Sequence, residues 1–144
     1  MSVKPMTFAV TLAAAALLNW AGPNPALAPH EVIAAVVEAL QHNNSPRPNA
    51  GVMAVYQFAS PANRRVTGPY GRFFLSVKSP PYAPLLKPST VEFDSMRLDG
   101  DRASQNVTVH SGKGEMFTFH FEVSRQHEAP CVGCWMVDTV VPVR

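Results

Sequence analysis

The sequence is short of charge and of cysteine, and it has neither a long basic run nor a long apolar one. Charged residues make up 15% of its 144 residues, against about 25% in typical globular domains. The formal net charge is +2, and the longest basic run is Arg64-Arg65. Proteins that bind nucleic acid usually carry a basic face or stripe, so we expect no nucleic-acid partner. Because 47% of the residues are hydrophobic, the chain can bury enough apolar surface to fold, and its length predicts one domain.

The longest uncharged apolar run is Phe8–Leu18, with 11 residues. A membrane-spanning helix needs about 20 residues, so we expect no membrane span in the mature chain. Lys4 precedes the run and Ala26-Leu27-Ala28 follows it as a small-x-small cleavage signal, the order found in export signals. We interpret residues 1–28 as a targeting segment, although export peptidases disfavour a proline such as Pro29 directly after the cut. The expected location is the periplasm or the medium. The alternatives are an organelle lumen such as the thylakoid, or a membrane to which an uncleaved signal anchors the chain.

Only two cysteines are present, in the stretch Cys131-Val132-Gly133-Cys134. A redox-active pair with this spacing normally opens a helix, whereas this pair follows Pro130 and precedes an apolar run typical of a strand. A structural zinc site needs further ligands, and a haem attachment motif needs a histidine where Trp135 stands. In an exported protein the pair predicts a disulfide between Cys131 and Cys134. Two free thiols, or a redox or metal-binding role, are the alternatives.

The first half of the expected mature chain has helical periodicity. An apolar stripe with helical spacing follows Pro29 and consists of Val32, Ile33, Val36, Val37 and Leu40. Pro46 ends this helix, because the residue before a proline avoids the helical region. The same pattern predicts a second helix over Ala50–Ala59, a short turn over Ala62–Arg65 and a third helix over Tyr70–Val77.

After Pro88 apolar and polar residues alternate, which is typical of strands. Strands are predicted over residues 91–98, 103–110, 116–123 and 135–141, with tight turns at 99–101 and 111–114. A change of parity at Asp94-Ser95 predicts a β-bulge. The clearest strand directs one row of side chains inward: Phe117, Phe119, Phe121 and Val123. Helices first and a meander of about four strands after them predict an α+β domain over residues 29–144.

Four stretches carry a family resemblance: Tyr56-Gln57-Phe58-Ala59-Ser60-Pro61-Ala62-Asn63, Thr67-Gly68-Pro69, Tyr82-Ala83-Pro84-Leu85-Leu86 and Gly133-Cys134-Trp135-Met136-Val137. With the helix-first order, the chain from Pro29 to Val143 resembles the domain of unknown function 4864 family. That family is similar to the wider nuclear transport factor 2-like superfamily. The resemblance implies a curved antiparallel sheet wrapped around helices as a cone with one open end. It implies no activity, because members of the superfamily include isomerases, dehydratases and binding modules.

An enzyme of this superfamily's usual kind would need an acid or a base that points into the cone. Strict alternation on the last strand places Trp135, Val137, Thr139 and Val141 on one face, and Met136, Asp138 and Val140 on the other. Asp138 is the first catalytic candidate and Asp94, at the expected bulge, is the second. Tyr56 and Tyr82 are candidate polar groups of a pocket.

His110, His120 and Glu122 lie on adjacent predicted strands, and two histidines with a carboxylate can bind a metal ion. His120, however, is on the face opposite the phenylalanine row, so its side chain points toward solvent or a partner subunit. We therefore expect neither a metal site nor a bound cofactor.

Two functions from different classes fit these observations. The favoured one is a non-catalytic binding or assembly module for a small apolar ligand or a protein partner. The alternative is a small-molecule lyase or isomerase that uses Asp138 or Asp94 with Tyr56, so the sequence leaves open whether the protein is an enzyme. The convex sheet face, with Met116 and Met136 assigned to it, predicts a homodimer, because exposed apolar faces mark interaction sites.

Overall fold

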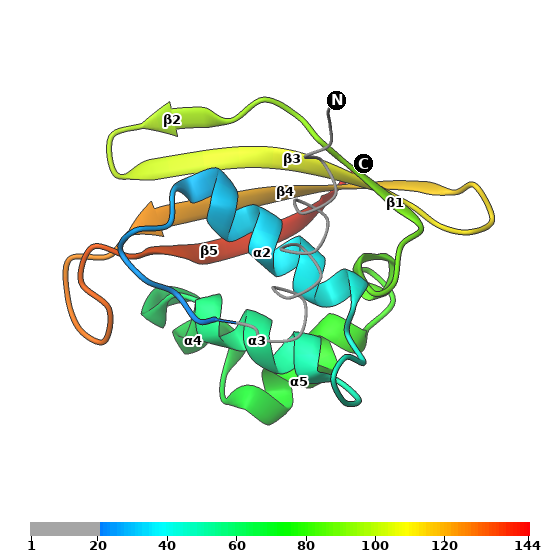
Figure 1. The fold of residues 1–144 in the computed structure, drawn as a ribbon, viewed down its shortest axis with the longest axis horizontal. Coiled ribbons are helices and arrows are strands. Elements are labelled where there is room, and N and C mark those ends of the chain that lie inside the picture. Colours follow the sequence, from blue (N-terminus) through cyan, green and yellow to red (C-terminus); the bar gives the residue numbers. More distant parts are fainter. Residues whose placement is uncertain (1–20) are drawn as a thin grey trace, which may run out of the picture.

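The computed structural model describes residues 21–144, which form a layer of helices and one antiparallel sheet (Figure 1). The predicted targeting run within residues 1–20 lies outside the described residues. The helices are α2 (Pro29–Gln41), α3 (Ala50–Phe58), α4 (Pro61–Thr67) and α5 (Tyr70–Lys78), followed by the short 3-10 turn η1 (Ala83–Leu85). The strands are β1 (Thr90–Phe93), β2 (Arg97–Asp99), β3 (Arg102–His110), β4 (Met116–Arg125) and β5 (Trp135–Val143). The predicted α+β fold, with helices before strands, is confirmed.

The sheet is open and has the strand order β1-β3-β4-β5, with β2 also paired to β3. Figure 1 shows α2 directly beneath the sheet, and α3, α4 and α5 in the layer below α2. Within residues 21–144, no helix is long and apolar enough to cross a membrane. The core therefore lies between the inner face of the sheet and the helices, with α2 at its centre.

Helix α2 is stabilised by the burial of the apolar stripe along one of its faces. The predicted stripe is buried, and Val32 and Ile33 have no exposed surface. The backbone N–H of Ala28 donates to the Glu31 carboxylate at 2.8 Å and so satisfies a group at the start of the helix. Leu27 packs against the core. The sequence assigns residues 1–28 to the targeting segment. In the structure, the end of that segment, residues 21–28, contacts the domain.

The turn from α2 to α3 depends on a close approach of the two helices. A Cβ atom at Gly51 would overlap the backbone carbonyl of Ala39, so only glycine fits there. Asn43, which is 2% exposed, lies in the same turn. Its side-chain oxygen accepts from the Val52 N–H at 2.9 Å, and its amide donates to Asn49 at 3.0 Å. A buried side chain with both polar ends satisfied holds the two helices in register.

The inner face of the sheet follows the predicted parity of β4. Phe119 and Val123 are each 1% exposed, and Phe121 has no exposed surface. On the opposite face of the same strand, Met116 is 65% exposed. Val107 of β3 pairs with Phe119 and is also fully buried. The phenylalanine row therefore forms the sheet side of the core, as predicted.

The predicted bulge near Asp94 is present and divides one predicted strand into two. Phe93 of β1 pairs with Val107, and Arg97 of β2 pairs with Ser104. Three residues of the outer chain, Asp94 to Met96, thus oppose two residues of β3. Because regular pairing with β3 stops at the bulge and resumes after it, the sheet has five strands where the sequence predicted about four.

A second bulge, which the sequence did not predict, interrupts β5. Val137 pairs with Val123 and Thr139 pairs with Glu122, and the register shifts between these two pairs. Asp138 is therefore an extra residue on β5 with no residue opposite it on β4. An extra residue of this kind changes which face every later side chain occupies.

The bulge makes the predicted faces of β5 wrong beyond Val137. Val140 pairs with the inward Phe121, so it faces the core, and Val141 pairs with the outward His120. Thr139 and Val141 are therefore on the outer face. The sequence predicted the opposite, with Val140 on the outer face and Thr139 and Val141 on the inner one. Met136, assigned to an exposed convex face, is only 2% exposed.

Candidate functional site

A pocket of about 290 Å³ opens between β5 and helices α3, α4 and α5. Its wall is mostly apolar, and its lining residues are Val36, Leu40, Val55, Ala59, Asn63, Val66, Thr67, Phe73, Ser76, Val77, Tyr82, Leu85, Phe121, Val137, Asp138, Thr139, Val140 and Val141. Small-molecule sites are typically apolar concavities of this kind with a few fixed polar groups. The volume is near the lower end of the range for such sites, about 300–1,000 Å³.

Helix α4 supplies part of the polar lining. Asn63 donates its amide to the backbone carbonyl of Val137 at 3.1 Å, which ties α4 to β5. The Thr67 hydroxyl donates to the backbone carbonyl of Asn63 at 3.1 Å. The sequence prediction missed both residues because it reduced α4 to a short turn. Ser60 ahead of Pro61 was the available signal, since the Ser60 hydroxyl accepts from the Asn63 N–H at 3.1 Å as a helix N-cap.

Among the described residues that line the pocket, Asp138 is the only charged one. It is partly buried, and the bulge on β5 places it beside the inward Val137. Its carboxylate makes no hydrogen bond or ion pair with any residue in the described part of the chain. Of the catalytic candidates proposed from the sequence, Asp138 is the one that the structure places at a pocket.

Tyr82 also lines the pocket, as the sequence suggested, but its hydroxyl is already engaged. It donates to the backbone carbonyl of Val140 at 3.0 Å. The ring stacks on Phe119, with centroids 6.3 Å apart. Tyr82 therefore lines the pocket with its ring and connects the loop after α5 to β5 through its hydroxyl.

Tyr56 does not line the pocket. Its ring belongs to a separate aromatic cluster with Tyr70 and Phe73, at centroid distances of 5.3 and 5.2 Å. The guanidinium of Arg64 lies 4.2 Å above the Tyr56 ring and donates to the Tyr56 carbonyl at 2.7 Å. Burial raises the pKa of Tyr70 above its ordinary value of 10.0, which fits a packing role for this cluster.

Asp94 is far from Asp138. It is exposed and sits at the bulge beside β3, where its N–H donates to the Asn106 carbonyl. Strands β3 and β4 separate it from β5. Three strand spacings, each about 4.8 Å, therefore lie between the backbone beside Asp94 and the backbone of Asp138. The structure thus does not bring Asp138, Asp94 and Tyr56 together in one acid–base site.

The two strand histidines pair with different partners. His120 lies 2.7 Å from the Asn106 side chain and 3.4 Å from Glu122, whereas His110 lies 3.4 Å from Glu92. In the part of the chain that the structure describes, no three His, Cys, Asp or Glu residues are grouped so that they could hold a metal ion. These contacts make the outer face of the sheet a polar surface on which histidines lie beside carboxylates.

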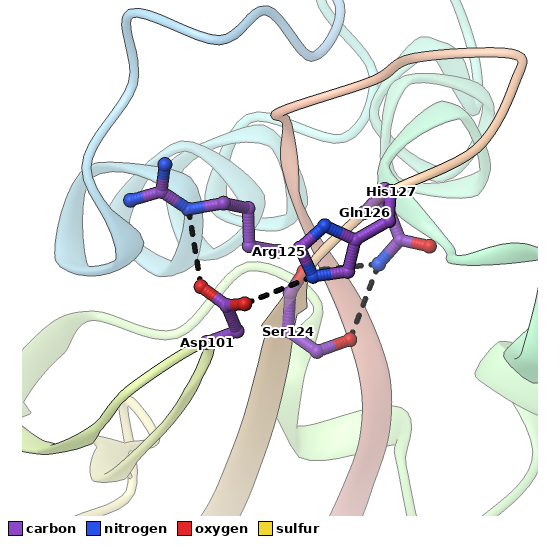
Figure 2. Close-up of polar contacts among 5 residues, drawn as sticks. All are labelled: Asp101, Ser124, Arg125, Gln126 and His127. Carbon is purple, nitrogen blue, oxygen red and sulfur yellow. Dashed lines mark hydrogen bonds and ion pairs between the residues drawn. The ribbon is translucent and has the colours of Figure 1, made fainter.

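A second polar cluster lies at the far end of the sheet, where the β2–β3 turn meets the end of β4 (Figure 2). The Asp101 carboxylate lies 2.9 Å from His127 and 3.5 Å from Arg125. Gln126 donates to the Ser124 hydroxyl at 3.1 Å and to its carbonyl at 2.9 Å. The Asp101 and His127 side chains are 53% and 69% exposed. This is a surface network that ties the turn to the next loop.

The contact between Asp101 and Arg125 was missed by the sequence prediction, although hairpin register could have found it. His110 pairs with Met116 at the β3–β4 turn. Each step back along β3 matches a step forward along β4, so counting nine residues both ways brings Asp101 opposite Arg125. The N–H of Arg125 indeed donates to the Asp101 carbonyl at 2.8 Å.

The structure joins Cys131 and Cys134 by a disulfide, with Cα atoms 5.6 Å apart. The bridge lies in the loop between β4 and β5. The Cys131 sulfur is 3.8 Å from the backbone oxygen of Pro23, and a Cβ at Gly133 would lie 3.5 Å from Pro25. The bridged loop therefore contacts the segment that precedes α2.

Comparisons with known proteins identify the family. Neither the curated proteins nor the solved structures give a match to this chain. The similarity to the nuclear transport factor 2-like superfamily accordingly stays a resemblance. Residues 26–143, most of the chain, match the family described as "Domain of unknown function (DUF4864)". The chain belongs to the DUF4864 family.

Proposed function

We propose that this domain is a binding module that holds a small, largely apolar molecule in the pocket between β5 and helices α3 to α5. The observation that carries the proposal is a cavity of about 290 Å³ whose wall is mostly aliphatic and aromatic. Burying apolar surface of a ligand in such a wall is favourable by roughly 25 cal/mol per Å² before the costs of association.

The polar groups around the pocket favour binding over acid–base catalysis. Such catalysis uses titratable groups that converge on the reacting atoms. Asp138 and Tyr82 are the titratable residues of the lining, and the Tyr82 hydroxyl is committed to a backbone carbonyl. The lyase or isomerase alternative would need a second proton-transferring group beside Asp138.

We also propose that the module works in an oxidising compartment outside the cytoplasm or in an organelle lumen. The disulfide between Cys131 and Cys134 is compatible with such a compartment. The apolar run Phe8–Leu18 supports export as well. N-terminal sequencing of the protein from its native source tests this proposal, because an intact Met1 in a soluble fraction would contradict it.

A homodimer through the outer face of the sheet is proposed as its assembly. Met116, Val141 and Val143 are 65%, 49% and 46% exposed, and the pairing of Val143 with Thr118 and of Val141 with His120 places them on one outer surface. The face also carries both a histidine and a carboxylate, His120 and Glu122, so two copies related by a two-fold axis could present hydrogen-bonding partners to each other.

Blocking the mouth of the pocket tests the binding function. Val66 lines the pocket and is 82% exposed, so Val66→Trp should cover the opening without disturbing the core. We expect the protein to bind 1-hexanol in isothermal titration calorimetry, and the Val66→Trp variant to lose most of that binding.

Leu75→Trp is the matched control, because Leu75 is 68% exposed on the neighbouring helix α5 and is not part of the pocket lining. This variant should bind 1-hexanol as the wild type does. Absence of binding by the wild type, or unchanged binding by Val66→Trp, would remove the support for the proposal.

A further inference from the structure

We propose that Asp138 makes the pocket selective for a positively charged amphipathic molecule, a small primary amine with an apolar body. The inference rests on the proposed binding function and specifies its ligand class. It starts from a partly buried aspartate among the residues that line an apolar pocket. Its carboxylate has no hydrogen-bond or ion-pair partner within residues 21–144.

The bulge on β5 explains why a carboxylate is there. Without an extra residue, strict alternation after the inward Val137 would put Asp138 on the outer face, toward solvent. At the register shift Asp138 instead has no partner residue on β4, and Val140 resumes the inward row. Asp138 and its inward neighbour Val137 are both among the residues that line the pocket. Bulges of this kind re-aim a side chain at the edge of a sheet and are found beside functional sites.

No positive charge of the protein neutralises Asp138 in the described residues. The lining contains no lysine, arginine or histidine. Arg64 is nearby on α4, but its guanidinium is bonded to the Tyr56 carbonyl and lies over the Tyr56 ring. A single unpaired negative charge beside apolar walls favours a ligand that brings its own positive charge, because desolvation strengthens their attraction.

The same charge acts against anionic ligands. A carboxylic acid of equal length would place like charges together in a region of low dielectric constant, which is costly. A neutral alcohol would keep the apolar contacts and donate one hydrogen bond without the charge. Three ligands of equal length with these head groups therefore differ only in their interaction with the Asp138 carboxylate. The apolar contacts of the chain are the same for all three.

The size of the pocket suits a small ligand. Its volume of about 290 Å³ is near the lower end of the range for small-molecule sites, about 300–1,000 Å³. We therefore choose probes with a short apolar chain of about six carbons and one head group. n-Hexylamine, 1-hexanol and hexanoate are therefore suitable probes, and at pH 7 the amine is protonated as a lysine side chain is.

The experiment is isothermal titration calorimetry of the full protein with the three probes at pH 7, for the wild type, Asp138→Asn and Asp94→Asn. We expect the wild type to bind n-hexylamine about ten-fold more tightly than 1-hexanol, as for other charge-assisted hydrogen bonds, and hexanoate most weakly. Asp138→Asn should lower the affinity for n-hexylamine to the level of the affinity for 1-hexanol. The affinity of this variant for 1-hexanol should equal that of the wild type. Asp94→Asn, which removes an exposed carboxylate outside the pocket, should retain the preference.

The ranking of the three probes by the wild-type protein tests the proposal even if Asp138→Asn fails to fold. Equal affinities for the amine and the alcohol would overturn the charge selectivity while leaving the apolar binding function intact. A preference for the amine that survives in a folded Asp138→Asn variant would assign the selectivity to another residue and would also overturn the proposal. If the wild type binds none of the probes, both the selectivity and the proposed binding function fail.

Discussion

The hydroxyl of Tyr82 donates a hydrogen bond of 3.0 Å to the backbone carbonyl of Val140, and this bond joins the loop after α5 to the edge of the sheet. Nearby, the Ser60 N–H donates to the Val137 carbonyl at 2.9 Å. Both carbonyls belong to β5, the last strand in the sheet order. Pro142 has no N–H to offer, as is usual for a proline in an edge strand. These contacts occupy two carbonyls of the β5 edge, which makes this part of the edge less able to pair with another chain.

Tyr82→Phe should lower the free energy of unfolding by about 1 kcal/mol, because it removes this one hydrogen bond and keeps the ring on Phe119. Urea denaturation of the purified protein measures the change. Tyr56→Phe is the control, since the Tyr56 hydroxyl has no hydrogen-bond partner in the described residues, and a change within about 0.5 kcal/mol is expected. Equal losses in the two variants would show that the Tyr82 bond contributes nothing specific.

Phe119→Ala should destabilise the domain by about 3–5 kcal/mol, as for a fully buried phenylalanine, because Phe119 is 1% exposed. Met116→Ala changes a side chain on the opposite face of the same strand that is 65% exposed, so its effect should stay within about 0.5 kcal/mol. Thermal and urea unfolding of both variants provide the comparison. A stable Phe119→Ala variant would mean that the inner and outer faces of β4 are reversed.

The difference between β4 and β5 shows what the sequence could and could not predict. Four consecutive inward positions with large apolar side chains, from Phe117 to Val123, make only one register favourable on β4. On β5, after Val137, valine occurs on both faces, since Val140 faces inward and Val141 faces outward, so the alternation contains no signal that marks Asp138 as an extra residue. The bulge becomes visible only through pairing with β4, which is a tertiary interaction.

The same distinction applies to the candidate site. Asp138 and Tyr82 could be proposed from the sequence as residues near a pocket, but their relation to Asn63 and Thr67 could not. Those side chains reach the pocket because α4 is a full helix that packs on β5. Conversely, Tyr56 looked suitable by residue type, yet its helix directs it into the cluster with Tyr70.

Replacing both cysteines, as Cys131→Ser with Cys134→Ser, should lower the free energy of unfolding by about 2 kcal/mol or less. The loop that the bridge closes is short, so its effect on the entropy of the unfolded chain is small. Urea denaturation with and without reductant measures the effect. The reductant should destabilise the wild type and leave the double variant unchanged. Identical wild-type curves in both conditions would show that the bridge does not stabilise the domain.

The proposed homodimer predicts that Val143→Lys converts a dimer into a monomer. Val143 is 46% exposed, pairs with Thr118 on the outer face and is not in the pocket lining, so a lysine there would oppose its two-fold copy without entering the core. Light scattering at micromolar concentration measures the mass. Leu75→Lys, at a site 68% exposed on α5, is the control and should remain dimeric. A wild-type monomer would end the proposal, and Met136→Lys is not informative because Met136 is only 2% exposed.

The segment before α2 should stabilise the domain, so a chain that begins at Pro29 should be less stable than one that begins at Ala21. The shorter chain loses the contact of Leu27 with the core and the hydrogen bond from Ala28 to Glu31. Partial burial of a leucine and one helix-end hydrogen bond together contribute about 2 kcal/mol. Urea denaturation of the two chains measures the difference.

Leu27→Ala in the chain that begins at Ala21 separates the two contributions, because it removes the apolar contact and keeps the backbone of Ala28. We expect it to account for about half of the loss. The result also bears on export, since a cut after Ala28 would remove a stabilising segment, whereas a cut before Ala21 would leave it in place. Equal stability of the chains beginning at Ala21 and at Pro29 would show that the segment is dispensable, and a mature N-terminus at Pro29 would then be compatible with the fold.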